Sequence, residues 1–369
     1  MIKEIVRPSS VVEIQDLARQ QAKLAVRGGG SKPALQPAST GGVLVDMTGL
    51  AGMLEYQPDE FTFTAWAGSR VEEIQRALGE RGQFMPFDPL LVERGATLGG
   101  TVASGLSGPG RYRYGGLRDF VLGVKFVDGM GNLVHSGGKV VKNAAGFDLS
   151  KFMVGSLGRY GVLVELSVKV FPQPAEYATL RVEFAAVAEA LAALTRLASA
   201  PLELFALDLE AHDGGCALMA RLGGLPESLP ARLERLQILA ATNGERLHAE
   251  AFSYLEGDAE AEVWRSMREF TWVPPGYSLV KAPLTPRRVL PLDEQLAAYG
   301  ALRRYSAGAN LAWIAWPGPI ESLHALLKEK ALSGLAVFGS LGQPTLGVTV
   351  GDAFARRVKS ALDPQGKFG

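Results

Sequence analysis

The sequence predicts an α+β protein of two domains, with a boundary near Pro174. Short β-rich segments alternate with amphipathic helices along the 369 residues, a length that lets each domain bury its own core. Many of the 44 glycines cluster in loops between Gly28 and Gly161, and the composition changes after Pro174. We therefore expect a first domain at 1–174, a second domain at 175–350, and a C-terminal helix and tail at 351–369 that return to the first domain.

The first domain combines helical and strand patterns. The segment 11–21 has apolar residues at helical spacing and follows Ser9 and Ser10, which are residues that begin helices. A second helix is expected at 71–82, with Ser69 as its cap. Strands are expected at 23–28, 43–48, 53–57, 61–68 and 161–174, and a hairpin at 120–138 with its turn at 128–131.

The second domain shows one order of elements twice. Its first set is strand 177–184, helix 187–198, strands 203–210 and 216–222, and helix 229–243. Its second set is strand 277–284, a helical stretch near 292–305, strand 311–317, helix 322–331 and strand 334–340. Two βαβ-like halves over one antiparallel sheet explain this order.

Charge and cysteine content narrow the classes of function. The 38 basic and 38 acidic residues cancel, and no block of Lys or Arg stands out, so we expect no nucleic-acid partner. The N-terminal segment MIKEIVRPSS places charges where a signal peptide needs an apolar core, and no apolar run approaches the roughly 20 residues of a membrane span. We expect a cytoplasmic protein without a transmembrane segment. The single cysteine, Cys216, is expected to be a buried structural thiol.

The segment VRGGGSK, Val26–Lys32, ends a strand in three consecutive glycines. Because glycine has no Cβ, successive backbone N–H groups there can point inward and form a nest for an anion. Ser31 adds a hydroxyl donor, and each hydrogen bond to a charged acceptor such as a diphosphate contributes about 1.5–3 kcal/mol. A glycine-rich hairpin turn explains the loop equally well by itself. The Rossmann fingerprint does not fit, since Pro33 stands where its last glycine belongs.

Two further glycine-rich segments are more specific. In the segment 93–131, small side chains let a backbone approach a flat ligand closely, and Thr97, Thr101 and Ser104 offer hydroxyls to it. The segment 142–174 ends as Gly161, Val162 and Leu163 enter a strand. The small residues of the segment 93–131 recur at Gly99, Gly100, Ala103, Ser104, Gly105 and Gly108.

In this order and spacing, the three segments resemble the FAD-binding domain of the vanillyl-alcohol oxidase / p-cresol methylhydroxylase (PCMH) flavoproteins. The resemblance covers residues 1–172. It implies a PCMH-type FAD-binding domain of two α+β subdomains, an α/β cap domain with an antiparallel sheet, and FAD as cofactor. It places the pyrophosphate at Arg27–Ser31, the ribityl and isoalloxazine side at 97–108, and a backbone contact near the adenosine or flavin at Val162. The implied cofactor-binding residues are Arg27, Gly28, Gly29, Gly30, Ser31, Thr97, Gly99, Gly100, Thr101, Ser104, Gly105, Gly108 and Val162.

Within that family, the segment 120–170 is similar to the FAD-binding subunits of bacterial glycolate oxidases (glycolate dehydrogenases), which oxidise glycolate to glyoxylate. This resemblance implies an oxidoreductase subunit that relays electrons or supports assembly rather than holding the substrate site. Its implied partners are a larger FAD-containing subunit and an iron–sulfur subunit, through which any membrane association is made. Two alternatives stay open. One is a stand-alone FAD-dependent oxidoreductase acting on a small hydroxy acid, and the other is a structural subunit whose FAD is vestigial.

Some residues that the family uses are missing. Many members attach FAD covalently through a histidine in the glycine loop, where this sequence has Gly30 and Ser31, so we expect FAD to be bound non-covalently. The catalytic hydroxy-acid dehydrogenases carry an H-x-G-D-G-N-x-H element, and the comparable segment here, GVTVGDAFA, has no histidine. No catalytic residue can be assigned. No metal site is expected, because the four histidines are scattered without ligand spacing: His135, His212, His248 and His324.

The sequence contains a group of arginines and a pair of tryptophans whose roles the motifs do not decide. The arginines Arg111, Arg113 and Arg118 alternate with tyrosines, and they could face the flavin or a carboxylate substrate, lie in a solvated loop, or form a partner surface. The pair Trp313 and Trp316 is interpreted as packing at a strand end rather than as a platform for a substrate.

Overall fold

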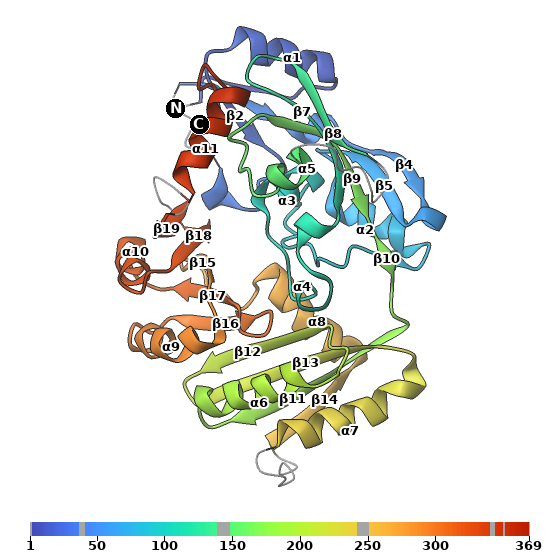
Figure 1. The fold of residues 1–369 in the computed structure, drawn as a ribbon, viewed down its shortest axis with the longest axis vertical. Helices are drawn as coiled ribbons and strands as arrows, with labels where there is room; N and C mark the ends of the chain where they lie inside the picture. Colours follow the sequence, from blue (N-terminus) through green and yellow to red (C-terminus); the bar gives the residue numbers. More distant parts are fainter. Residues whose placement is uncertain are drawn as a thin grey trace. The chain divides into compact units, whose positions relative to one another are not determined.

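The computed structural model describes residues 2–36, 41–138, 148–241, 251–339, 344–349 and 351–368, and it has the predicted α+β fold (Figure 1). The chain divides into two compact units. Unit 1 comprises Met1–Ser107, Gly116–Gln173 and Val350–Gly369, and unit 2 comprises Gly108–Gly115 and Pro174–Thr349. Among the described residues, no helix is both long and apolar enough to span a membrane.

Unit 1 begins with a small parallel sheet in which β3 lies between β1 and β2. Helix α1 (Val11–Gln20) starts where the sequence predicts, because the Ser10 side chain accepts a hydrogen bond from the Glu13 N–H. Ile14 and Ala18 of this helix are buried in a core that Val45 of the sheet shares. The strands are β1 (Glu4–Val6), β2 (Leu24–Arg27) and β3 (Val43–Asp46).

The larger sheet of unit 1 is antiparallel, with the order β4-β5-β9-β7-β8. The predicted hairpin is its β7–β8 pair, whose turn is closed by the Asp128 carboxylate accepting the N–H groups of Met130 and Asn132. Ser69 does not cap α2 as predicted: its hydroxyl bonds to the backbone of Gly52, and Arg70 occupies the cap position. The elements are β4 (Met53–Gln57), β5 (Thr62–Trp66), α2 (Val71–Gly79), α3 (Leu98–Ser104), β7 (Val121–Val127), β8 (Leu133–Gly137), α5 (Leu149–Met153) and β9 (Val162–Lys169), with β6 (Gln83–Phe84) paired to β10 (Phe171–Pro172).

The C-terminal helix α11 (Asp352–Leu362) and the tail after it lie in unit 1. Buried Asp363 accepts hydrogen bonds from the N–H groups of Lys367 and Phe368 and forms an ion pair with Lys359 at 2.7 Å. Burial alone would raise the pKa of Asp363, but these donors outweigh it and the pKa is lowered. The tail thus turns back onto β2, where the Leu24 N–H donates to the Lys367 carbonyl at 2.9 Å.

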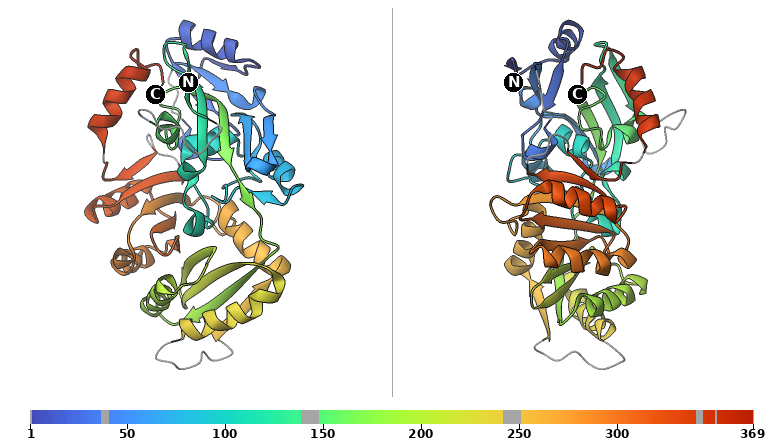
Figure 2. Two further views of the ribbon diagram at one scale, coloured as in Figure 1. Left: turned by 45° about the vertical axis from the view of Figure 1, so that its right-hand side comes forward. Right: turned by 90° about the vertical axis from the view of Figure 1, so that its left-hand side faces the viewer.

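Unit 2 is built on one nine-stranded antiparallel sheet of order β14-β11-β13-β12-β16-β17-β15-β18-β19 (Figures 1 and 2). Each half follows the order strand-helix-strand-strand-helix-strand, and the halves join where β12 pairs with β16. The first half comprises β11 (Glu176–Phe184), α6 (Val187–Ser199), β12 (Ala206–His212), β13 (Gly215–Gly224), α7 (Leu229–Ala240) and β14 (Phe252–Glu256), followed by α8 (Gly257–Glu269). The second comprises β15 (Ser278–Pro283), α9 (Val289–Ala298), β16 (Leu302–Ser306), β17 (Leu311–Trp316), α10 (Ile320–Glu329), β18 (Ser333–Phe338) and β19 (Thr345–Gly347).

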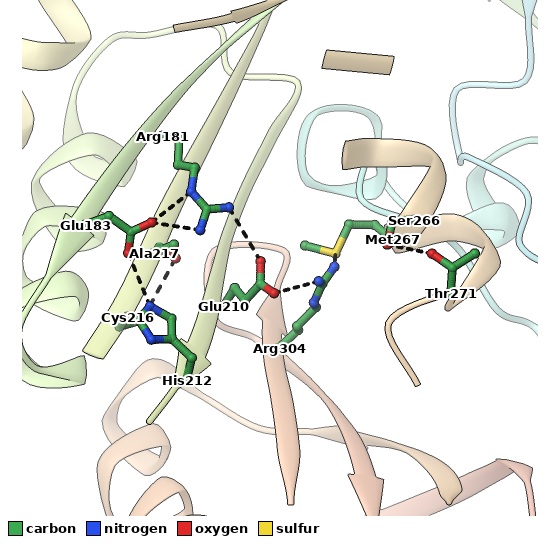
Figure 3. A network of polar contacts seen from close by, with 10 residues as sticks. All are labelled: Arg181, Glu183, Glu210, His212, Cys216, Ala217, Ser266, Met267, Thr271 and Arg304. Atoms are coloured by element: carbon green, nitrogen blue, oxygen red, sulfur yellow. Dashed lines mark hydrogen bonds and ion pairs between the residues drawn. The ribbon is translucent and has the colours of Figure 1, made fainter. Parts of the chain in front are cut away.

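The prediction of a single helical stretch near 292–305 is wrong. Helix α9 ends at Ala298, and Leu302–Ser306 forms strand β16 in the middle of the sheet. The strand has no hydrophobic pattern, because two arginines, Arg303 and Arg304, hold buried positions in it. Their charges are paired with the carboxylates of Asp293 and Glu210, and Figure 3 shows the second of these pairs. Strand β14 and helix α8 are likewise absent from the prediction.

Cys216 is fully buried on β13, as the sequence predicts. Burial and, to a lesser extent, the negative charge of Asp293 raise the pKa of its thiol to about 12. Asp293 also accepts hydrogen bonds from Arg303 and from the Tyr305 hydroxyl on the same buried layer. A thiol in this setting stays protonated at neutral pH, so Cys216 has a structural role.

Candidate functional site

Unit 1 contains a pocket of about 750 Å³, including its open mouth, where three segments of the chain and two single residues converge. The segments are the end of β2 with the loop after it, residues 97–104 at helix α3, and residues 157–163 leading into β9; the single residues are Met47 and Ala67. The lining residues are Val26, Arg27, Gly28, Gly29, Gly30, Ser31, Lys32, Leu35, Gln36, Met47, Ala67, Thr97, Gly99, Gly100, Ala103, Ser104, Leu157, Gly158, Gly161 and Leu163.

The three glycines after β2 are required for different reasons. A Cβ on Gly28 would lie 2.1 Å from the Thr97 hydroxyl oxygen, and a Cβ on Gly29 would lie 1.7 Å from the Gly95 carbonyl oxygen. Gly30 has φ of +72°, a left-handed conformation that side chains disfavour. Gly28 and Gly29 therefore let the loop pack onto the segment before α3, and this packing brings two walls of the pocket together.

Side chains at the loop give it a positive character. Arg27 pairs with Asp46 at 2.9 Å, and Asp46 also accepts the N–H and hydroxyl of Thr48. Burial raises the pKa of Asp46, but the bonds from Thr48 and Arg27 lower it further, so the carboxylate stays ionised and holds Arg27 in place. Buried Lys32 donates to the Ser31 hydroxyl oxygen at 3.2 Å. The Ser31 hydrogen is thereby free to donate to a ligand.

Helix α3 forms the opposite wall. The Thr97 hydroxyl accepts the Gly100 N–H and starts the helix. A Cβ on Gly99 would meet the Ala67 Cβ at 2.7 Å, so glycine lets α3 lie directly against the chain that follows β5. The sequence carries no signal for this helix, because glycines weaken helices.

The structure brings together most of the residues that the resemblance implied. Four lie outside the pocket lining. Val162 points into the core with Val45, because side chains alternate along β9 and its neighbours Gly161 and Leu163 face the pocket instead. Thr101 is buried within α3 away from the lining, Gly105 ends that helix with φ of +63°, and Gly108 belongs to unit 2. The nine that line the pocket are Arg27, Gly28, Gly29, Gly30, Ser31, Thr97, Gly99, Gly100 and Ser104.

Sequence reasoning missed the apolar part of the lining. Leu35, Met47, Leu157 and Leu163 contribute apolar walls suited to a flat ring, but isolated apolar residues in loops and strands carry no signal of their own. Gly158 could have been predicted as a lining residue, since it is one of the closely spaced glycines that precede β9. A nest of backbone amides, a hydroxyl donor and apolar walls together fit a dinucleotide with a flat aromatic ring.

The scattered histidines take structural or surface positions in the described part of the chain. His212 pairs with Glu183 at 3.2 Å, and the His324 ring accepts the Gly347 N–H. His135 is exposed on β8, and His248 lies outside the described residues. No group of three or more His, Cys, Asp or Glu side chains suited to a metal ion occurs among the residues that the structure describes.

Comparisons with known proteins agree with this geometry. A family profile described as FAD binding domain matches residues 2–137. "Glycolate oxidase subunit GlcE" of Escherichia coli is 31% identical over 376 residues, which cover 100% of this chain and 97% of that protein. The chain belongs to the PCMH-type FAD-binding flavoproteins. FAD is the cofactor of this family, and the pocket of unit 1 fits it.

Other relatives match between 36% and 69% of the chain. "Glycolate oxidase subunit GlcD" of Bacillus subtilis is 29% identical over 181 residues, which cover 48% of this chain and 38% of that protein. Among solved structures, an alkyldihydroxyacetonephosphate synthase superposes with a TM-score of 0.69 over 98% of this chain and 75% of its own. Its sequence identity is 17%, so this likeness concerns the fold alone.

A substitution that fills the pocket without touching the glycine loop tests the site. Ala103 is half-buried on α3 and lines the pocket, so Ala103→Leu should introduce a branched side chain into the space of the ligand. Overpacking of this kind costs about 1–3 kcal/mol, here against FAD affinity. We expect folded protein with strongly reduced flavin absorbance per chain.

The matched control is Ala353→Leu, which makes the same change at an exposed position of helix α11. It should leave the flavin content unchanged. Equal flavin content in both variants would show that the pocket lined by Ala103 does not hold FAD.

Proposed function

We propose that this chain is the FAD-binding subunit of a glycolate oxidase complex that oxidises glycolate to glyoxylate. The observation that carries the proposal is the end-to-end similarity to the Escherichia coli subunit, which spans both units of the chain, together with a pocket in unit 1 that fits FAD. The matches to the other relatives cover between 36% and 69% of the chain, whereas this one covers all of it. Agreement along the second unit therefore favours this subunit over a catalytic dehydrogenase.

Different residues of the pocket would contact different parts of FAD. The N–H groups of Gly28, Gly29 and Gly30 and the Ser31 hydroxyl would hold the pyrophosphate, with the charges of Arg27 and Lys32 beside them. The apolar walls exclude water from the ring system. FAD supplies the redox chemistry when bound, and the protein supplies its position and electrostatic environment.

The partners that we propose are a larger FAD-containing subunit and an iron–sulfur subunit. The chain has one cysteine, and its thiol is buried and protonated, so an iron–sulfur cluster has to be held by another chain. No histidine of the chain has a motif that places it as a base for an α-hydroxy acid, and that step is therefore assigned to the larger subunit. In this arrangement the present chain relays electrons or supports assembly.

The linkage to FAD can be tested by acid precipitation. Gly30 and Ser31 occupy the positions at which relatives carry a histidine for covalent attachment. We therefore expect all of the flavin to appear in the supernatant after the protein is precipitated. Yellow colour retained in the washed pellet would contradict non-covalent binding.

The division of labour can be tested with the purified, FAD-loaded chain. It should show negligible reduction of a dye acceptor with glycolate or D-lactate, because it lacks a base positioned for the substrate. Adding the larger flavin subunit and the iron–sulfur subunit should produce turnover. Robust turnover by the chain alone would favour the stand-alone oxidoreductase, and full complex activity after FAD is lost from this chain would favour a vestigial cofactor.

A further inference from the structure

The ammonium group of Lys359, on helix α11, has three acceptors around it. Its Nζ donates to the Arg159 carbonyl oxygen at 2.6 Å and to the Phe368 carbonyl oxygen, and it pairs with the Asp363 carboxylate at 2.7 Å. A lysine ammonium has three N–H donors, so these three acceptors can use all of them. The Lys359 side chain is only 27% exposed, so its charge-assisted contacts are incompletely screened by water.

The first acceptor, Arg159, lies in a loop that forms part of the flavin pocket. This loop, residues 157–161, contributes Leu157, Gly158 and Gly161 to the pocket lining. The backbone is left-handed at Leu157, with φ of +53°, and at Gly158, with φ of +72°. A left-handed conformation is unfavourable for leucine, so contacts around the loop have to hold it in this shape.

Contacts from two helices hold the loop. The Leu157 N–H donates to the Ala103 carbonyl of α3 at 2.9 Å, which ties the loop to the neighbouring wall of the pocket. Helix α11 supplies the lysine bond, and its Phe354 ring packs edge-on against Phe152 of α5, with 6.2 Å between the ring centroids. The Phe152 ring in turn packs against Tyr160 of the loop at 4.8 Å. The loop is therefore attached to α11 both by a charged donor and by aromatic packing.

A second acceptor, Phe368, lies beside another wall of the same pocket. It forms a β-bridge with Leu24 of β2, and its ring is buried in the core against which Val26 packs. Val26 stands near the end of β2 and lines the pocket. Through its two carbonyl acceptors, Lys359 therefore connects the loop 157–161 with the strand that carries the glycine loop.

We propose that Lys359 is a positioning residue for FAD, which holds the loop 157–161 in its binding shape through the Arg159 carbonyl. Lys359 is not among the residues that line the pocket, so it acts through the loop and not by touching the cofactor. Without this bond the loop loses its charged anchor, and FAD should leave the pocket faster. The inference takes from the proposed function only that FAD occupies the pocket of unit 1.

The test follows the release of FAD from the full-length, FAD-loaded chain. The flavin that remains with the protein is measured at intervals after dilution. Lys359→Met removes the ammonium but keeps an unbranched side chain of similar length. Because it removes a hydrogen bond from a charged donor, we expect release to become roughly tenfold faster. In the flavin-free chain, hydrogen exchange of the backbone amides at 157–161 should also become faster, and this readout does not depend on where FAD binds.

A matched control lies on the same helix. Arg357→Met removes one positive charge at an exposed position of α11 and should release FAD like the unchanged protein. Equal release rates in Lys359→Met and Arg357→Met would overturn the proposal. If the Ala103→Leu variant keeps its flavin, the assignment of the pocket fails, but hydrogen exchange at 157–161 still reports whether Lys359 holds the loop.

A double variant separates this role from simple neutralisation of Asp363. Lys359→Met leaves the buried Asp363 carboxylate without its charge partner, which by itself destabilises the tail. Asp363→Asn removes that charge with little change of shape. We expect the variant with both substitutions to release FAD as fast as Lys359→Met, and Asp363→Asn alone to have the smaller effect, because Lys359 still reaches Arg159. Slow release restored in the double variant, or release from Asp363→Asn as fast as from Lys359→Met, would show that the lysine only neutralises the aspartate.

Discussion

The close approach of the loop after β2 to the segment before α3 is the constraint on which the flavin site depends. Gly28 and Gly29 have no room for a side chain, because Thr97 and the Gly95 carbonyl occupy the places where a Cβ would stand. Because of this contact, the residues of the loop line the same pocket as Ser104 and Gly100. The C-terminal tail supports the strand that carries this loop, since Lys367 accepts a hydrogen bond from Leu24. Residues more than 300 positions apart thus position one loop.

Unit 2 has to accommodate charged side chains in the interior of its sheet. A nine-stranded antiparallel sheet offers two faces, and both carry ionised groups near the middle of the sheet. Buried charges are costly unless they are paired, and the Arg304–Glu210 and Arg303–Asp293 pairs meet that requirement on opposite faces of β16.

Much of the fold and part of the site could be predicted from the sequence. Helix α1, the β7–β8 hairpin and the glycine loop have strong local signals, so their positions follow from spacing alone. Strand β16 was missed because its arginines are buried by partners distant in sequence, and no periodicity reveals such pairs. The Val162 side chain lies in the core while Gly161 and Leu163 line the pocket, because side chains alternate along a strand. The contact of the Val162 backbone with FAD stays a prediction. The apolar lining depends on packing and has no sequence pattern.

Hydrogen exchange of the flavin-free chain, measured with and without added FAD, tests the central claim most directly. If the pocket of unit 1 holds the cofactor, FAD should slow exchange of the backbone amides at 28–31 and at 157–163, where the ligand would accept or cover them. Exchange in helices α6 and α7 of unit 2 should stay unchanged. Protection confined to unit 2, or no protection at the glycine loop under saturating FAD, would contradict the account.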